Sequence, residues 1–316
     1  YRVAHHETSE NQMTKIAYAS AKGGSASGGK KYIVANWKNH PDSVAEAEDI
    51  LAYIDEYLKN ETDKKERSLI ICPPFVFLDD VNKILNTSRL AQQVELGAQD
   101  IALSDSGAWT GEVSGPMLKR LGVKYVIVGH SDRRWKISES DEIVNKKLKT
   151  ILANEITPIV CVGERERNAE FKNFLKNQIE ATFAGLSAGE IGKCLIAYEP
   201  VWAISRPAAD IARSRVDVEH GVEPQRQTRS RDDQRSAEDN IGTGTPDTPE
   251  SVLESIAIIQ DVLNSKFVIR NSKFLYGGSV TASNVKDFLS LNQIAGVLVG
   301  GASIQKEEFI QILKNL

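Results

Sequence analysis

The chain has 316 residues, 41% hydrophobic and 26% charged, which suits one large globular domain or two ordinary ones and excludes a collagen-like or wholly disordered chain. Its formal net charge of -4 provides no global attraction to nucleic acid or to an anionic membrane, and no apolar stretch approaches the length of a membrane span. The cysteines, Cys72, Cys161 and Cys194, form no disulfide framework, so we expect buried free thiols in a cytoplasmic protein. Any anionic ligand must therefore be small and held by a local site.

Strand-like runs alternate with amphipathic helical patterns from Tyr32 to the end of the chain. The predicted strands are nearly continuous in hydrophobic residues and cover residues 32–37, 69–73, 94–99, 125–129, 158–163, 195–199, 274–277 and 296–299. Apolar residues at i, i+3 and i+4 predict helices at 43–58, 141–153, 169–183, 249–264, 284–289 and 306–316. Strands that alternate with helices predict a parallel sheet buried on both faces, closed into a (β/α)8 barrel. A doubly wound open sheet is the competing architecture.

Residues 1–31 precede the first predicted strand and are interpreted as a flexible arm. They are polar and contain GGSASGG at 23–29, which is typical of a flexible linker. His5 and His6 lie side by side in this arm without further ligands, so no metal site is predicted there. The barrel is expected to span residues 32–316.

A second segment, residues 205–241, interrupts the alternation of strands and helices. It holds seven arginines and eight acidic residues, with neither lysine nor an aromatic residue. Such a composition cannot bury enough apolar surface to offset the entropy of ordering, so we expect a mostly disordered insertion. The acidic residues cancel the arginines and no aromatic side chain is present to stack on bases, which argues against a nucleic-acid partner.

Polar residues stand where three of the predicted strands end. The first strand finishes with Asn36 and Lys38, the fourth is followed by His130, and the sixth ends at Glu199. The loops after the strands of a barrel gather at one face, where active sites lie. A lysine, a histidine and a glutamate are therefore predicted to converge. Singly each signal is weak, because a lysine at a strand end is more often solvated and a glutamate there is able to pair with an arginine.

Paired glycines follow the last two predicted strands. The seventh strand leads into YGGSV at 276–280 and the eighth into VGGAS at 299–303. Glycines before a helix let backbone N–H groups approach a phosphate, helped by the positive end of the helix. A phosphate site is predicted at this edge, with a simple turn as the alternative.

Together and in this order, the strand ends resemble those of the triosephosphate isomerases. The resemblance runs from about Tyr32 to Leu316, the insertion excepted, and is carried by VANWK, VGHSDRR, AYEPVWAI, GTG, YGGSV and VGGAS, with CPPF, AQD and WTGEVS in support. It implies a single TIM barrel whose insertion lies in the sixth βα loop, the active-site lid. It also implies an enzyme of glycolysis and gluconeogenesis that interconverts dihydroxyacetone phosphate and D-glyceraldehyde 3-phosphate without cofactor or metal.

The resemblance also assigns roles to the candidate catalytic residues. Moving a proton between adjacent carbons through an enediolate needs a base, an electrophile and a pocket that excludes water. By resemblance Glu199 is the base and neutral His130 the electrophile, a pairing already established for this family. Lys38 would supply positive charge to the enediolate and the phosphate, and Asn36 would aid orientation. Asp132 is expected to support them.

By the same resemblance, backbone N–H groups of Gly242, Ser279, Gly300 and Gly301 hold the substrate phosphate. Lid closure is an established property of the family, and the lid of this chain would contain Gly242. Phosphate contact at Gly242 would then close the lid over the site.

A loop at residues 107–114, GAWTGEVS, resembles the protruding third loop of the family. In the family this loop docks into a neighbouring subunit, close to the residues equivalent to Asn36 and Lys38. A homodimer is therefore expected, with the triose phosphate as the small-molecule ligand.

Three features depart from the family pattern. Asp132 stands where the family usually has glutamate, so its carboxylate is one methylene shorter. The insertion at 205–241 separates Ile204 from Gly242, which the family joins directly, and Pro246 restricts the backbone at the usual hinge of the lid. The leading prediction is an active isomerase. The alternatives are a catalytically impaired barrel that still binds phosphate, and an interaction scaffold that acts through the insertion.

Overall fold

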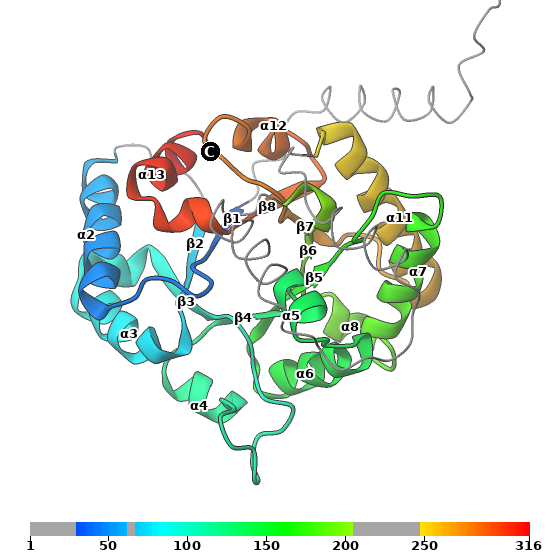
Figure 1. The fold of residues 1–316 in the computed structure, drawn as a ribbon, viewed down its shortest axis with the longest axis horizontal. Coiled ribbons are helices and arrows are strands. Elements are labelled where there is room, and N and C mark those ends of the chain that lie inside the picture. Colours follow the sequence, from blue (N-terminus) through cyan, green and yellow to red (C-terminus); the bar gives the residue numbers. More distant parts are fainter. Residues whose placement is uncertain (1–29, 62–66, 205–246) are drawn as a thin grey trace, which may run out of the picture.

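The computed structural model describes residues 30–61, 67–204 and 247–316, and at their centre lies a closed barrel of eight parallel strands (Figure 1). The first strand pairs with the last, with Tyr32 opposite Gly296. This pairing confirms the predicted (β/α)8 barrel and excludes the doubly wound open sheet. In chain order the strands are β1 Lys31–Asn36, β2 Arg67–Cys72, β3 Val94–Ala98, β4 Tyr125–Val128, β5 Thr157–Val162, β6 Leu195–Tyr198, β7 Lys273–Tyr276 and β8 Ile294–Val299.

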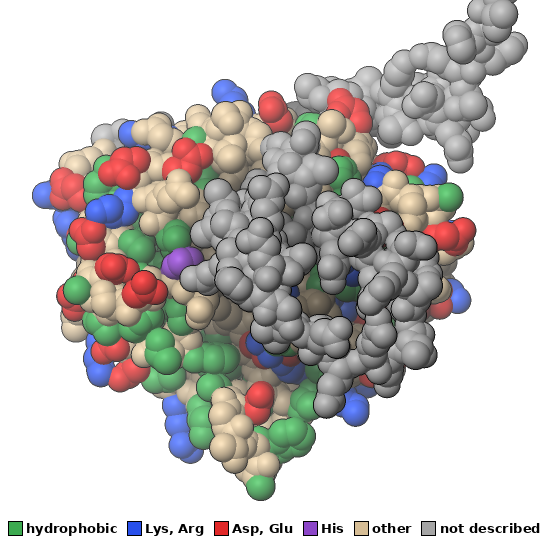
Figure 2. Space-filling model, in the orientation of Figure 1, with side chains coloured by type: hydrophobic (Ala, Val, Ile, Leu, Met, Phe, Trp, Pro, Cys, Tyr) green, Lys and Arg blue, Asp and Glu red, His purple; other side chains and the backbone are tan. Residues whose placement is uncertain are grey.

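Helices surround the barrel, and their outer faces carry charged side chains of both signs on the side shown in Figure 2. The helices predicted from apolar spacing are all present: α2 Val44–Asn60, α6 Asp141–Ala153, α7 Phe171–Thr182, α11 Pro249–Phe267, α12 Val285–Leu289 and α13 Lys306–Lys314. The described residues also form α3 Leu78–Thr87, α4 Gly115–Arg120, α5 Ser131–Lys136 and α8 Ala188–Ile191. Short 3-10 helices are η1 Phe75–Phe77, η2 Arg89–Gln92, η3 Val201–Ala203 and η4 Gly301–Ile304. The shortest elements hold too few residues for a helical period to show in the sequence.

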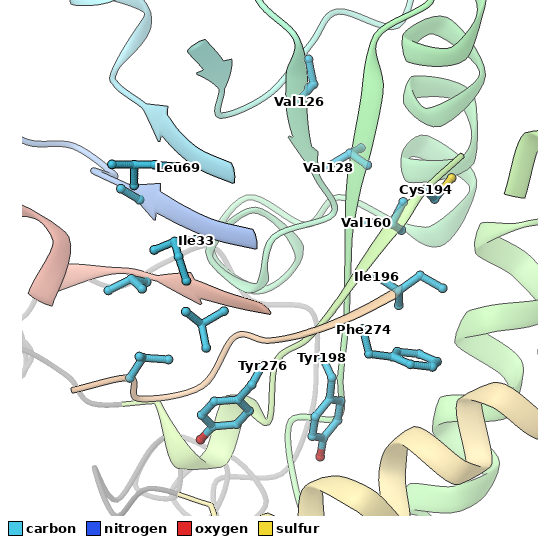
Figure 3. Close-up of a cluster of buried hydrophobic side chains, with 14 of the residues drawn as sticks. Ile33, Leu69, Val126, Val128, Val160, Cys194, Ile196, Tyr198, Phe274 and Tyr276 are labelled. Carbon is cyan, nitrogen blue, oxygen red and sulfur yellow. The ribbon is translucent and has the colours of Figure 1, made fainter. Parts of the chain in front are cut away.

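Apolar side chains fill both faces of the sheet. Alternate residues of a strand point to opposite faces, so neighbours in β1 belong to different clusters. Val34 lies in a cluster drawn from strands around the barrel interior, whereas Ile33 and Ala35 belong to the layer between strands and helices. Figure 3 shows this outer layer, with Ile33, Leu69 and Val128 among its labelled side chains. Burial on both faces explains why the strands read as continuous apolar runs.

The three cysteines are buried and free, as predicted. Burial raises the pKa of the Cys194 thiol to about 12, and it also raises the pKa values of Cys72 and Cys161. A buried thiol with a raised pKa is a poor nucleophile, so these cysteines serve packing.

The arm predicted at residues 1–31 and the insertion predicted at 205–241 lie outside the described residues, apart from the last two residues of the arm. Lys31 already belongs to β1, one residue before the expected start of the barrel. No helix within 30–61, 67–204 or 247–316 is long and apolar enough to cross a membrane.

Three buried charged side chains and one partly exposed arginine form a network between the end of β3 and helices α5 and α6. Lys147 Nζ lies 2.6 Å from both Asp100 Oδ2 and Glu139 Oε1. Arg133 Nη2 lies 2.7 and 2.6 Å from the same two oxygens. The two cations thus compensate the two carboxylates. Without them, burying two negative charges would cost several kcal/mol, roughly, in lost hydration. The network ties α6 to α5, the helix that follows β4.

We expect Lys147→Ala to lower the free energy of unfolding by about 3–5 kcal/mol, because it leaves the buried carboxylates of Asp100 and Glu139 with one cation. Lys146→Ala, at the neighbouring exposed position of α6, should change it by no more than about 0.5 kcal/mol. Urea unfolding followed by circular dichroism measures both values. Equal losses in the two variants would show that the network does not stabilise the fold.

Candidate active site

His130 follows β4 and is the N-cap residue of α5. Its Nδ1 accepts a hydrogen bond from the backbone N–H of Asp132 at 3.1 Å. An atom that accepts this bond carries no proton, so the neutral ring bears its proton on Nε2. Burial lowers the pKa of the His130 imidazole below its usual value, against the opposing charge of Glu199. The ring is therefore neutral near pH 7, and its Nε2–H is the donor that it offers.

Glu199 follows β6 and lies beside this imidazole. The residue is 2% exposed, and its Oε2 accepts a hydrogen bond from the backbone N–H of Ser131 at 2.8 Å. Its Oε1 lies 3.1 Å from His130 Nε2 but makes no aligned hydrogen bond with any described residue. The pairing of Glu199 with an arginine, left open by the sequence, is not among the ion pairs of the described residues. One carboxylate oxygen is thus held and the other is available to a reacting group.

Lys38 reaches the same place from the end of β1. Its Nζ lies 3.0 Å from Asp132 Oδ2, so the shorter carboxylate at position 132 does reach a cation from another strand end. Burial raises the pKa of Asp132, but the charge of Lys38 and hydrogen bonds from Lys136 and Lys38 outweigh it and hold this pKa well below its usual value. The approach of 3.5 Å between His130 Nδ1 and Asp132 Oδ2 is too long for a hydrogen bond, and Nδ1 is already occupied.

The backbone of Lys38 adopts a left-handed conformation, with φ of 54°. This conformation is costly for a residue with a side chain and persists where neighbouring groups enforce it. Asn36 Oδ1 accepts a hydrogen bond from the Lys38 N–H at 3.0 Å, and Gln99 Nε2 donates to the Lys38 carbonyl at 2.8 Å. Gln99 was missed as a site residue, although it stands in the AQD motif after the third strand. Asn36 and Gln99 together hold Lys38 in place.

Three of the residues expected to bind phosphate lie at strand ends: Ser279 after β7, and Gly300 and Gly301 after β8. Ser279 Oγ donates a hydrogen bond to the Ala203 carbonyl at 2.9 Å, beside the segment that follows Glu199. A side chain at Gly300 would come within 3.2 Å of Lys38 Cε, so the end of β8 lies against the lysine. Gly301 begins η4 directly afterwards. Gly242 and Pro246 lie outside the described residues.

Glu164, which follows β5, is a buried carboxylate that the sequence reasoning missed. Its oxygens accept hydrogen bonds from the Tyr198 hydroxyl at 2.9 Å and from Trp202 Nε1 at 3.0 Å. Arg167 Nη1 compensates its charge at 3.0 Å. Glu164 thereby fastens η3, the segment just after Glu199, to the barrel. The available signal was an acidic residue directly after an apolar strand.

Two glycines make room for Glu199. A Cβ atom at Gly163 would lie 1.8 Å from the Glu199 carbonyl oxygen, and one at Gly277 would lie 3.0 Å from Glu199 Cγ. The first distance is far inside van der Waals contact with backbone that cannot rotate away. Position 163 therefore requires glycine, whereas a side chain at position 277 would press on the Glu199 side chain and shift it by a few tenths of an ångström.

The structure brings together a buried carboxylate, a neutral imidazole and a lysine at the carboxyl ends of β6, β4 and β1. The described residues hold no cluster of three or more His, Cys, Asp or Glu side chains suited to a metal ion. Fold and site together define a (β/α)8 barrel with a carboxylate, an imidazole and an ammonium group at the strand ends, the face where the active sites of such barrels lie.

Comparison with known proteins shows to which family of barrels the chain belongs. The sequence matches the triosephosphate isomerase family over residues 31–231 and 238–316. The structure is similar to the crystal structure of triosephosphate isomerase from Bartonella henselae, with a TM-score of 0.66 and 28% sequence identity, over 90% of this chain and 98% of that chain. The chain belongs to the triosephosphate isomerase family and is an isomerase.

We expect Gly163→Ala to lower the free energy of unfolding by about 1–3 kcal/mol and to reduce turnover, because the new methyl group displaces the Glu199 backbone. Gly189→Ala is the matched control, since a Cβ atom there meets no described heavy atom within 4 Å. Chemical unfolding and steady-state kinetics report the two effects. Full turnover in Gly163→Ala would show that the close approach does not position Glu199.

Proposed function

We propose that this chain interconverts dihydroxyacetone phosphate and D-glyceraldehyde 3-phosphate by proton transfer through an enediolate. The observation that carries the proposal is the pair formed by Glu199 Oε1 and His130 Nε2, 3.1 Å apart and buried at the mouth of the barrel. A base and a hydrogen-bond donor side by side can act on adjacent atoms of one small substrate. Membership of the family supports this choice of substrate and reaction.

Glu199 is proposed as the base. It is buried, and its carboxylate forms no ion pair with a lysine or an arginine among the described residues. Ser131 N–H holds Oε2, which leaves Oε1 to take a proton from carbon and return it to the neighbouring carbon. A carboxylate held by one oxygen keeps its direction while the other oxygen reacts.

His130 is proposed as the neutral electrophile. Because Nδ1 accepts the N–H of Asp132, the ring can only donate through Nε2. This donor would polarise the substrate carbonyl and stabilise the oxygen of the enediolate. The neutral ring would give its Nε2 proton to one substrate oxygen and take the proton of the other oxygen back on Nε2, so that it ends neutral again.

Lys38 is proposed to supply positive charge to the enediolate and the phosphate, with Asn36 holding its backbone and Asp132 its ammonium group. The protein as a whole carries a net charge of -4, so an anionic substrate depends on this local cation. Burial of the neighbouring groups strengthens the attraction by lowering the local dielectric constant.

Backbone N–H groups of Gly242, Ser279, Gly300 and Gly301 are proposed to bind the phosphate group. The ends of β7 and β8 support this role, because Gly300 lies against Lys38 and Ser279 lies against Ala203. A phosphate there would sit between the lysine and the segment that follows Glu199. The carbon chain of the substrate would then extend toward the base.

The alternatives of an impaired barrel and of an interaction scaffold concern residues 205–241, outside the described residues. Turnover of the purified chain with and without this segment separates them from an active isomerase.

We expect Glu199→Asp to lower kcat by about 100-fold or more with the fold intact, because the shorter carboxylate then lies too far from the substrate carbon. His130→Gln should lower kcat by about 100-fold, and Glu48→Asp, on the exposed face of α2, should leave it unchanged. Wild-type turnover in Glu199→Asp would remove this residue from the base role.

A homodimer is proposed through the loop at 107–114. Trp109 in this loop is 47% exposed, Met117 in α4 is 55% exposed and Val76 in η1 is 77% exposed. Figure 2 shows hydrophobic side chains gathered over α3, α4 and the protruding loop below them. Exposed apolar groups gathered in this way are typical of a surface that packs against another subunit.

We expect light scattering to give the mass of a dimer at micromolar concentration, and Trp109→Asp to shift the chain toward monomer with loss of activity. Val268→Asp is the control, since Val268 is a more exposed apolar residue at the end of α11. A fully active monomer would contradict the proposed dimer.

A further inference from the structure

Two lysines flank the Asp132 carboxylate, one at each oxygen. Lys38 Nζ, from the end of β1, lies 3.0 Å from Oδ2, and Lys136 Nζ, from the last turn of α5, lies 3.0 Å from Oδ1. The spacing of four residues along a helix places Lys136 on the same face as Asp132. Each oxygen therefore has its own cation, and together the two contacts define the plane in which the carboxylate lies.

The short side chain of Asp132 makes the second contact important. A glutamate, usual at this position in the family, has an extra methylene with which to reach toward β1. The aspartate carboxylate stays close to the α5 backbone and is directed by two torsion angles only. Its side chain is 34% exposed, so water competes for either oxygen. A cation on the same helix can hold one oxygen and turn the other toward Lys38.

We infer that Lys136 is a positioning residue of this site, and the inference rests on the function proposed above. Lys136 orients Asp132, Asp132 orients the Lys38 ammonium group, and Lys38 meets the anionic substrate. When Lys38 turns toward the substrate, Lys136 remains to compensate the Asp132 charge. Lys136 itself is 70% exposed and forms no ion pair with His130 or Glu199, and its charge is only the last of the causes that act on the pKa of the His130 imidazole.

Steady-state kinetics of a small set of variants tests this chain of contacts. K136M should lower kcat/KM about two- to fivefold, the range expected for a partly exposed ion pair, and K136R should restore it to within about 1.5-fold of the wild type. In the D132E background, where the longer carboxylate reaches Lys38 unaided, K136M should cost less than about 1.5-fold. K146M removes the same charge from the exposed face of α6 and should have no effect.

Several outcomes would overturn the inference. They are an unchanged kcat/KM in K136M, an equal loss in the wild-type and D132E backgrounds, and a loss in K146M as large as that in K136M. The last two would show a general effect of charge rather than action through Asp132.

A crystal structure of K136M gives a second measurement that does not need turnover. The Asp132 carboxylate should leave Lys38, with the nearest N–O distance beyond the ~4 Å limit of an ion pair. A retained contact near its present 3.0 Å would refute the positioning role. If the wild-type chain does not isomerise triose phosphates, the proposed function fails, and this structure still decides what Lys136 does.

Discussion

The first turn of α5 has backbone N–H groups with no partner inside the helix, as every helix does. In this chain the N–H of Ser131 binds the Glu199 carboxylate and the N–H of Asp132 binds the His130 imidazole. One helix end therefore sets the direction of both side chains and the tautomer of the histidine. Both groups come from strands that end at the same face of the barrel, so a shift of this turn would move them together.

The position of α5 depends in turn on Arg134 and Gly129. Arg134 Nε donates to the Gly129 carbonyl at 2.6 Å, and its Nη1 pairs with Asp141 at the start of α6 at the same distance. Gly129 turns the chain with φ of 69°, and a Cβ atom there would lie 2.9 Å from Val144 Cγ1. A side chain at position 129 would be strained and would press on Val144, so glycine suits this turn, and the buried guanidinium of Arg134 then fixes the helix against its neighbours.

Three carboxylates around the site differ in their surroundings, and the differences suit different tasks. Glu164 is buried with Arg167 and two neutral donors, so it serves as an anchor. Asp132 lies between two lysines, which keep it ionised across the usual pH range. Glu199 is buried beside a neutral histidine with no cation among its described contacts. The proposed base is thus the one of these three carboxylates without a cation beside it among the described residues, and its Oε1 makes no aligned hydrogen bond there.

The sequence by itself predicted the alternation of strands and helices and the face on which the polar residues meet, whereas the closure of the sheet into a barrel was decided by the pairing of β1 with β8. Strands buried on both sides leave long apolar runs, and parallel strands end at one face, so the sequence groups Asn36, Lys38, His130 and Glu199 at that face. Which atoms touch was decided by the tertiary structure. The reach of Asp132 to Lys38 and the contacts of Glu164 depend on distances of a few ångströms between elements far apart in the chain. Residue types and their spacing specify local periods, whereas such distances arise only when helices and strands pack against one another.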